Sequence, residues 1–174
     1  ASAVSYNEKK VVGKQADRLL IANYPVAELA RTNARFRLDV LQQYARLNPD
    51  VSKPSLHLAV AFHPSESLSP EKLQTIGQEV MQGAGFGRQP YLVYQHHDTA
   101  HPHLHIVSVS VDAQGNRIND SFLKNRLQQL RRKLEVKHQL MPAEKHSARR
   151  QGSGVGEGAT NSEALSERIS RIIR

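Results

Sequence analysis

Gln95-His96-His97-Asp98-Thr99-Ala100-His101-Pro102-His103-Leu104-His105 is the stretch that decides the fold, because it holds five of the nine histidines of the chain. Val93 and Tyr94 before it, and residues 106–109 after it, are residue types that favour strands. Residues 98–102 between the two arms favour a turn. The stretch therefore predicts a β-hairpin that carries imidazoles on both arms.

The spacing of these histidines predicts a metal site. Because strand side chains alternate between the two faces, His103 and His105 point to the same side, and His96 at the end of the preceding arm can lean toward them. Three neutral imidazoles that converge from two strands form half a coordination shell for a divalent metal, with positions left for water or a phosphate oxygen. Such open positions are typical of catalytic metal sites.

Composition narrows the class of protein. A chain of 174 residues with 39% apolar content is long enough for one soluble domain. The net charge of +8 favours a polyanionic partner, nucleic acid first and an acidic membrane second, although a basic surface can also serve solubility alone. The absence of cysteine leaves histidine and carboxylates as metal ligands. No apolar run approaches the roughly 20 residues of a membrane span, and no signal peptide is evident, so we expect no membrane insertion and a cytoplasmic location.

Hydrophobic periodicity predicts an α+β fold. Strands are predicted at 56–62, 91–95 and 103–111, and helices at about 6–20, 26–46, 69–82 and 121–140. This order indicates an antiparallel sheet with helices packed on one face and the histidines on the other. Because three strands make a thin sheet, we expect a fourth, either from residues assigned to loops or from a segment upstream of Ala1.

Most of the excess positive charge lies near the C-terminus. Residues 121–150 hold nine Lys and Arg against two Glu. This segment is either a groove for a nucleic-acid backbone or the solvated face of a helix with a leucine stripe. If it is a groove, the candidate DNA contacts are Arg126, Arg131, Arg132, Lys133, Lys137 and the turn residue His101. Residues 1–150 are predicted to form the domain, 151–160 a flexible linker and 161–174 a C-terminal helix that could begin a truncated region.

Three segments together resemble a known family. The run His96-x-Asp98-x-x-His101-Pro102-His103-x-His105-Ile106-Val107, preceded by Gly85-Phe86-Gly87-x-Gln89-Pro90-Tyr91, resembles the metal motif of mobilisation relaxases. The segment Ser5-Tyr6-Asn7-Glu8-x-Lys10-Val11 resembles their nucleophile segment, and Leu134-Glu135-x-Lys137 with Leu140 resembles their closing helix. The likeness covers most of residues 6–142. It is nearest to the Mob-type histidine-hydrophobe-histidine endonucleases of Bacteroides-like mobile elements.

The resemblance implies a reaction and a set of roles. His96, His103 and His105 would hold the metal, and Tyr6 would attack a phosphodiester of single-stranded DNA at a transfer origin. The tyrosine would stay joined to the 5′ phosphate and release a 3′ hydroxyl. The family fold would be an antiparallel sheet of about five strands flanked by helices. Its first strand precedes the tyrosine and has no counterpart here, so Tyr24 is a second candidate nucleophile.

The resemblance also implies a cofactor and partners. The metal would be Mg²⁺ or Mn²⁺, while nitrogen ligands also suit Zn²⁺, Ni²⁺ or Co²⁺. The setting would be the bacterial cytoplasm, with accessory mobilisation proteins as further partners.

Other interpretations stay open at this stage. The run from His101 to Val107 also matches the pattern of histidine-triad nucleotide hydrolases and transferases, and a non-catalytic DNA-binding module is a third alternative. Asp98 either orients a ligand imidazole and serves catalysis, or is an ordinary turn carboxylate. His97 is expected to face away from His96 and be exposed. His57 is expected to pack in the sheet.

Overall fold

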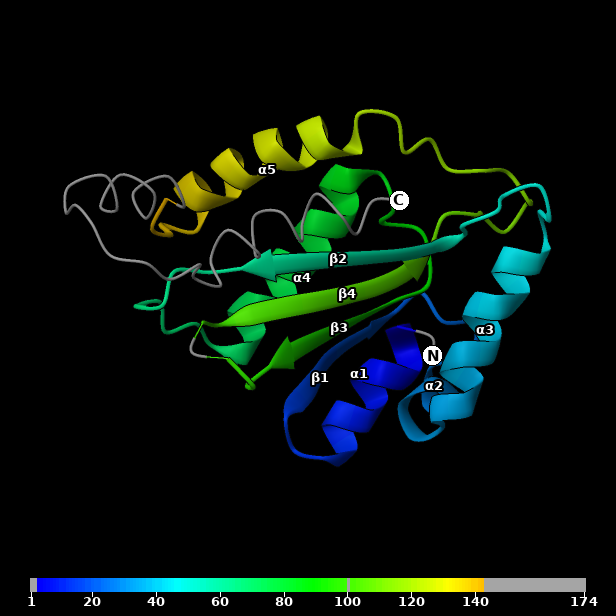
Figure 1. The fold of residues 1–174 in the computed structure, drawn as a ribbon, viewed down its shortest axis with the longest axis horizontal. Helices are drawn as coiled ribbons and strands as arrows, with labels where there is room; N and C mark the ends of the chain where they lie inside the picture. Colours follow the sequence, from blue (N-terminus) through cyan, green and yellow to red (C-terminus); the bar gives the residue numbers. More distant parts are fainter. Residues whose placement is uncertain (1–2, 100, 143–174) are drawn as a thin grey trace, which may run out of the picture.

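The computed structural model describes residues 3–99 and 101–142, which form an antiparallel sheet flanked by helices (Figure 1). Its four strands run in the order β1 (Ala16–Ala22), β3 (Tyr91–His96), β4 (His103–Val109) and β2 (Ser55–Ala61). The predicted hairpin is β3 with β4, and it forms the middle of the sheet. The α+β prediction is confirmed, with four strands in the described residues where the family resemblance implied about five.

The fourth strand comes from residues that the sequence analysis assigned to a helix. The helix α1 (Ala3–Val12) ends where Lys14 adopts the left-handed backbone conformation, with φ of 56°. The amide of Gln15 then donates to the carbonyl of Lys10, and that of Lys14 to Val11, which is the hydrogen-bond pattern of a Schellman helix end. β1 follows at once and pairs with β3. No segment upstream of Ala1 is needed for the four-stranded sheet.

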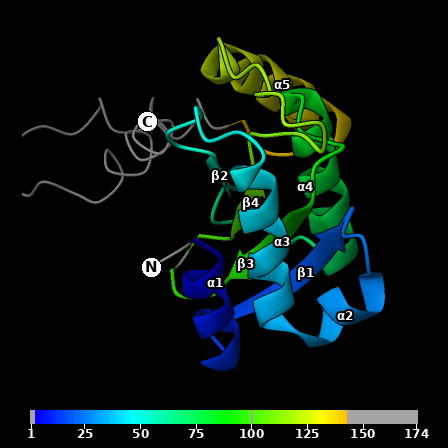
Figure 2. The same cartoon turned by 90° about the vertical axis from the view of Figure 1, so that its right-hand side faces the viewer.

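Helices cover both faces of the sheet, so the prediction that they pack on one face only is wrong. On one face, α4 (Pro70–Ala84) packs against β3 and β4, and α5 (Leu123–Lys137) packs on α4. On the other face, α1, α2 (Ala27–Thr32) and α3 (Ala34–Arg46) cover part of the sheet, as Figure 2 also shows. The reason is that residues 91–94 of β3 are all buried, which requires cover from both sides.

The ends of the helices follow from local capping chemistry. The predicted helix over 26–46 is divided at Asn33, whose backbone is extended and whose side-chain oxygen accepts the amide hydrogen of Phe36. α4 begins after the Ser69 cap and ends at Gly85, whose φ of 88° suits glycine, as predicted. The predicted linker at 151–160 and terminal helix at 161–174 lie outside the described residues. Among the residues described, no helix combines the length and the apolarity that a membrane crossing requires.

A partly buried group of charges holds α1 on the sheet. The carboxylate of Glu8 accepts hydrogen bonds from Arg37 at 2.6 Å, from the Tyr94 hydroxyl at 2.7 Å and from Arg18 at 2.8 Å. Burial alone would raise the pKa of Glu8, but these partners lower it below its usual value. The three partners belong to α3, β3 and β1, so Glu8 joins α1 to a neighbouring helix and to two strands of the sheet.

We predict that Glu8→Ala destabilises the protein strongly. The Arg37 side chain is only 3% exposed, so the substitution leaves a buried guanidinium without its carboxylate, at a cost of about 3 kcal/mol or more. The matched control is Glu28→Ala, which removes an exposed helix pair with Arg31 and should cost less than about 0.5 kcal/mol. Urea unfolding followed by circular dichroism measures both. Equal losses in the two variants would contradict the anchoring role of Glu8.

Candidate active site

The hairpin brings the three predicted metal ligands together. His96 lies opposite His103 in the register of β3 with β4, and His105 follows two residues later on the same face. The ring centroids of His96 and His105 are 4.1 Å apart, and His103 lies 5.2 Å from each. One ring nitrogen from each residue lies within 4.8 Å of the others. Such a group could hold a divalent ion.

One nitrogen of each of these three rings has a hydrogen-bond partner outside the group of three. The partners are a side-chain amide, a backbone carbonyl and another imidazole: Asn7 Oδ1 at 2.6 Å from His96 Nε2, the His101 carbonyl at 2.9 Å from His103 Nδ1, and His57 Nε2 at 2.7 Å from His105 Nδ1. This leaves Nδ1 of His96 and Nε2 of His103 and His105 for an ion. Second partners of this kind are what fix the ring orientation of metal-binding histidines.

The electrostatics of the cluster suit metal binding. Burial, assisted by the ammonium of Lys10 and the adjacent imidazole of His103, lowers the pKa of His96 to about 4. Burial, assisted by His96, His57 and His103, lowers the pKa of His105 to about 3. Both rings are therefore neutral near pH 7 and offer lone pairs without first losing a proton. The donor set of three imidazole nitrogens fits a divalent transition metal.

Asp98 lies at the open side of the cluster rather than behind it. Its Oδ1 is 3.7 Å from His96 Nδ1 and 3.7 Å from His103 Nε2, which is too long for a hydrogen bond. Its other oxygen pairs with the ammonium of Lys10. Burial would raise the pKa of Asp98, but the pairing with Lys10 lowers it, so the carboxylate is charged at neutral pH. The structure thus places Asp98 beside the nitrogens that remain available for an ion.

The two candidate tyrosines lie in contrasting environments. Tyr6 on α1 is 48% exposed, and its ring centroid is 6.2 Å from that of His96. Tyr24 is 9% exposed, and its hydroxyl donates to the backbone oxygen of Arg37 at 3.2 Å. Burial raises the pKa of the Tyr24 phenol well above its usual value. Of these two phenols, only that of Tyr6 lies beside the histidine cluster and is open to solvent.

Lys10 connects the tyrosine to the hairpin. It lies one helical turn after Tyr6 on the same face of α1, and its ammonium is 5.0 Å from the centre of the Tyr6 ring. Burial would lower the pKa of Lys10, but hydrogen bonds with Asp98 and Tyr6 raise it above its usual value. A cation at neutral pH therefore lies beside both the candidate nucleophile and Asp98 of the hairpin.

Comparison with models of known protein families matches residues 6–140 to the family described as Relaxase: MobA/VirD2-like, nuclease domain. The chain belongs to this family. The matched region begins at Tyr6 and contains the whole histidine hairpin, so it includes the site described above. Neither the comparison with curated proteins nor that with solved structures gives a match. The resemblance to mobilisation relaxases is confirmed, and the family identifies a DNA-nicking enzyme that acts on single-stranded DNA.

The basic helix of this relaxase lies away from the histidine cluster. α5 packs on α4, and α4 covers the face of the sheet opposite the histidines. Several of the candidate DNA contacts have partners within the protein: Arg126 donates to the Asn119 carbonyl at 2.8 Å, Lys137 pairs with Glu79 at 2.8 Å, and Arg131 pairs with Glu135 at 3.5 Å. A groove for DNA that ran along α5 would therefore not pass directly over the three histidines.

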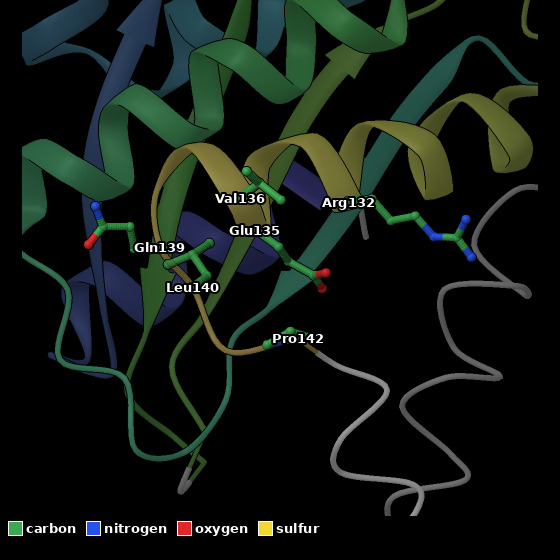
Figure 3. A pocket seen from close by; sticks show the side chains of 6 residues that line it. All are labelled: Arg132, Glu135, Val136, Gln139, Leu140 and Pro142. Carbon is green, nitrogen blue, oxygen red and sulfur yellow. The ribbon is translucent and has the colours of Figure 1, made fainter.

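A pocket lies at the C-terminal end of α5, as Figure 3 shows. Its volume is about 350 Å³, and its lining residues are Arg132, Glu135, Val136, Gln139, Leu140 and Pro142. Only Arg132 among the predicted site residues takes part in it. The pocket shares no lining residue with the histidine cluster.

Two further histidines of the hairpin lie outside the three-ring cluster. His97 is 45% exposed and bonds to Asp17 at 2.8 Å, so it is exposed as predicted but also tied to β1. His101 contributes its backbone carbonyl, which bonds the His103 ring.

Sequence reasoning missed three residues of the site. Asn7, Lys10 and His57 each contact a predicted site residue, yet they come from α1 and β2, far from the hairpin in sequence. The position of Lys10 four residues after Tyr6 was a usable signal, because such residues share a helix face. His57 was expected to pack in the sheet, and no local pattern indicates its pairing with His105.

We predict that His103→Ala weakens Mn²⁺ binding by about tenfold or more, because it removes one nitrogen of the three. Isothermal titration calorimetry of the full chain with MnCl₂ measures the affinity. His97→Ala is the matched control, since it removes a hairpin imidazole that bonds to Asp17 instead of joining the cluster. Unchanged affinity in His103→Ala, or an equal loss in the control, would show that the ligand set is different.

Proposed function

We propose that this relaxase nicks one DNA strand at a transfer origin by metal-dependent transesterification, with Tyr6 as the nucleophile. The observation that carries the proposal is the position of Tyr6, which is exposed and lies beside the cluster of three imidazoles, with its ring centroid 6.2 Å from that of His96. The product would be a 5′-phosphotyrosine link that carries a plasmid or mobile element during transfer. A histidine-triad hydrolase needs no tyrosine, so the position of Tyr6 beside the histidines gives no support to that alternative.

The histidines and Tyr6 have separate roles in the proposed reaction. His96, His103 and His105 would hold the ion, which when bound supplies positive charge for the non-bridging oxygens of the scissile phosphate. The Tyr6 oxygen forms a bond to phosphorus and gives up its proton, while the bond from phosphorus to the 3′ oxygen breaks. The departing 3′ oxygen takes up a proton and leaves as a hydroxyl. No water is consumed, so the phosphoester bond is exchanged and not lost.

Lys10 and Asp98 complete the proposed site. The Lys10 ammonium lies beside the Tyr6 ring, where it would stabilise the negative charge that develops on the attacking phenol oxygen and the phosphate. Asp98 keeps this ammonium in place and adds a carboxylate next to the ligand nitrogens of His96 and His103. A phenol also has a much lower pKa, about 10, than an alcohol, which makes the tyrosine a good leaving group for the reverse, rejoining step.

The metal is proposed to be Mn²⁺ or Mg²⁺, with Zn²⁺, Ni²⁺ and Co²⁺ as ions that the same nitrogens would accept. Three imidazoles favour the softer ions, and the Asp98 oxygen beside them adds a ligand type that Mn²⁺ and Mg²⁺ prefer. Accessory mobilisation proteins are the further partners that we expect at the origin.

We predict that Tyr6→Phe abolishes the covalent protein-DNA adduct while leaving DNA binding nearly unchanged, because it removes only the attacking oxygen. The matched control is Tyr24→Phe, which removes a hydroxyl bonded to the Arg37 backbone and should leave adduct formation intact. Labelled single-stranded origin DNA, denaturing electrophoresis and mass spectrometry of the modified peptide measure the outcome. An adduct in Tyr6→Phe, or its loss in Tyr24→Phe alone, would overturn the assignment.

The basic residues of α5 are proposed to bind DNA that flanks the nick. α5 packs on α4, on the face of the sheet opposite the histidines. This position suits contacts with DNA that passes round the edge of the domain, and does not suit contact with the scissile phosphate. The residues are Arg126, Arg131, Arg132, Lys133 and Lys137. His101, in the turn beside His103, is proposed to contact DNA next to the nick.

We predict that the double substitution Arg132→Ala with Lys133→Ala weakens binding to long origin DNA and lowers the salt dependence of log K by about two. Cleavage of a short oligonucleotide that covers only the nick should be unaffected, because these residues would not reach it. Fluorescence anisotropy at several NaCl concentrations measures the slope. A slope equal to that of the unsubstituted protein would show that α5 does not bind DNA.

A further inference from the structure

His57 lies beside a proposed metal ligand without belonging to the ligand cluster. β2 pairs with β4 so that Ala59 is opposite His105 and His57 is opposite Val107. His57 and His105 therefore occupy the same face of the sheet on neighbouring strands. Their ring centroids are 4.9 Å apart, and His57 Nε2 is 2.7 Å from His105 Nδ1. This distance is that of a good hydrogen bond between two ring nitrogens.

A hydrogen bond between two imidazoles contains one proton, so its direction matters. If His105 Nδ1 donates, the Nε2 atom of neutral His105 keeps its lone pair, and that atom can bind a metal. If His57 Nε2 donates, the proton of neutral His105 must sit on Nε2, where it blocks the ion. Only the first direction is compatible with His105 as a ligand alongside His96 and His103.

We propose that His57 is a positioning residue that fixes the tautomer of His105. His57 Nε2 accepts the Nδ1 proton of His105 and so keeps the Nε2 lone pair directed toward His96 and His103. The proposal rests on the proposed function, in which these three rings hold the metal. It gives His57 the same task for His105 that the Asn7 amide oxygen performs for His96 and the His101 carbonyl performs for His103.

The alternative role, that of a fourth ligand, does not fit the contacts of His57. Its Nε2 atom is already bonded to His105, and the group of side chains whose ligand atoms converge contains His96, His103 and His105 but not His57. An amide oxygen could replace the acceptor function of His57, but as a ligand it suits Zn²⁺ far less than an imidazole nitrogen does. This difference makes the proposal testable by substitution.

The first experiment measures Zn²⁺ affinity by isothermal titration calorimetry on the full chain, because this ion prefers imidazole nitrogen to amide oxygen. His57→Phe keeps a ring but removes the acceptor, and it should weaken binding by about 10- to 100-fold, the usual effect of losing a partner behind a metal ligand. His57→Gln offers an amide oxygen as acceptor and should bind much as the unsubstituted protein does. His63→Phe, at a loop histidine that bonds to Ser65, is the control for loss of a histidine elsewhere.

Two results of this titration would overturn the proposal. Unchanged affinity in His57→Phe would show that the hydrogen bond has no influence on the site. An equal loss in His57→Gln and His57→Phe would show that His57 acts as a ligand. Circular dichroism melting identifies any variant that fails to fold, and in that case the tautomer of the unsubstituted protein decides.

The second experiment reads the tautomer directly. Long-range proton-nitrogen correlation spectra of the ¹⁵N-labelled, metal-free protein should show the His105 proton on Nδ1 and none on Nε2, a readout that a merely structural role for His57 would not require. A proton on His105 Nε2 would overturn the proposal. If the unsubstituted protein binds no Mn²⁺ and no Zn²⁺, the proposed metal chemistry fails. The spectrum would still show whether His57 accepts the proton.

Discussion

The pairing of β3 with β4, with His96 opposite His103, is the constraint on which the site depends. In an antiparallel pair, a slip of one residue would move the histidines of one strand to the other face of the sheet. The register is secured by the alternate residues of the same strands, because Val93, Leu104 and Ile106 are buried under α4. The apolar core on one face therefore determines where the imidazoles lie on the other. Because strand side chains alternate between the two faces, the packing that stabilises the sheet also sets the positions of the histidines.

The second requirement is that α1 stays on the histidine side of the sheet. Its apolar burial is small, with Val4 and Asn7 as its buried residues, so packing alone gives it little hold. The hydrogen bonds of Glu8 to Arg37, Arg18 and Tyr94 supply that hold. The neighbouring positions of the same helix then carry Tyr6 and Asn7 to His96 and Lys10 to Asp98. A short helix held by one partly buried carboxylate thus supplies the residues of the proposed reaction that the hairpin lacks.

Sequence reasoning succeeded where the deciding interactions are local and failed where they are not. The hairpin, the Ser69 cap and the Gly85 helix end depend on residues within a few positions of one another. β1 was mistaken for helix because Ala16, Leu19 and Leu20 also fit helical spacing. Its strand form follows from pairing with β3, whose residues lie 69 to 80 positions later in the chain. The position of α5 behind α4 was equally out of reach, since a leucine stripe shows that a helix packs but not against what.

The sequence by itself determined that His96, His103 and His105 would share one face of a hairpin, because the alternation of strand side chains is a local property. It also identified the relaxase family through motifs that the family comparison bears out over residues 6–140. Only the tertiary structure set Tyr6 beside His96 and buried Tyr24, and only it added Asn7, Lys10 and His57 to the site. These contacts, between Tyr6 or Asn7 and His96, Lys10 and Asp98, and His57 and His105, join residues that are between 48 and 90 positions apart. Such contacts arise from packing and strand register, which no short stretch of sequence specifies.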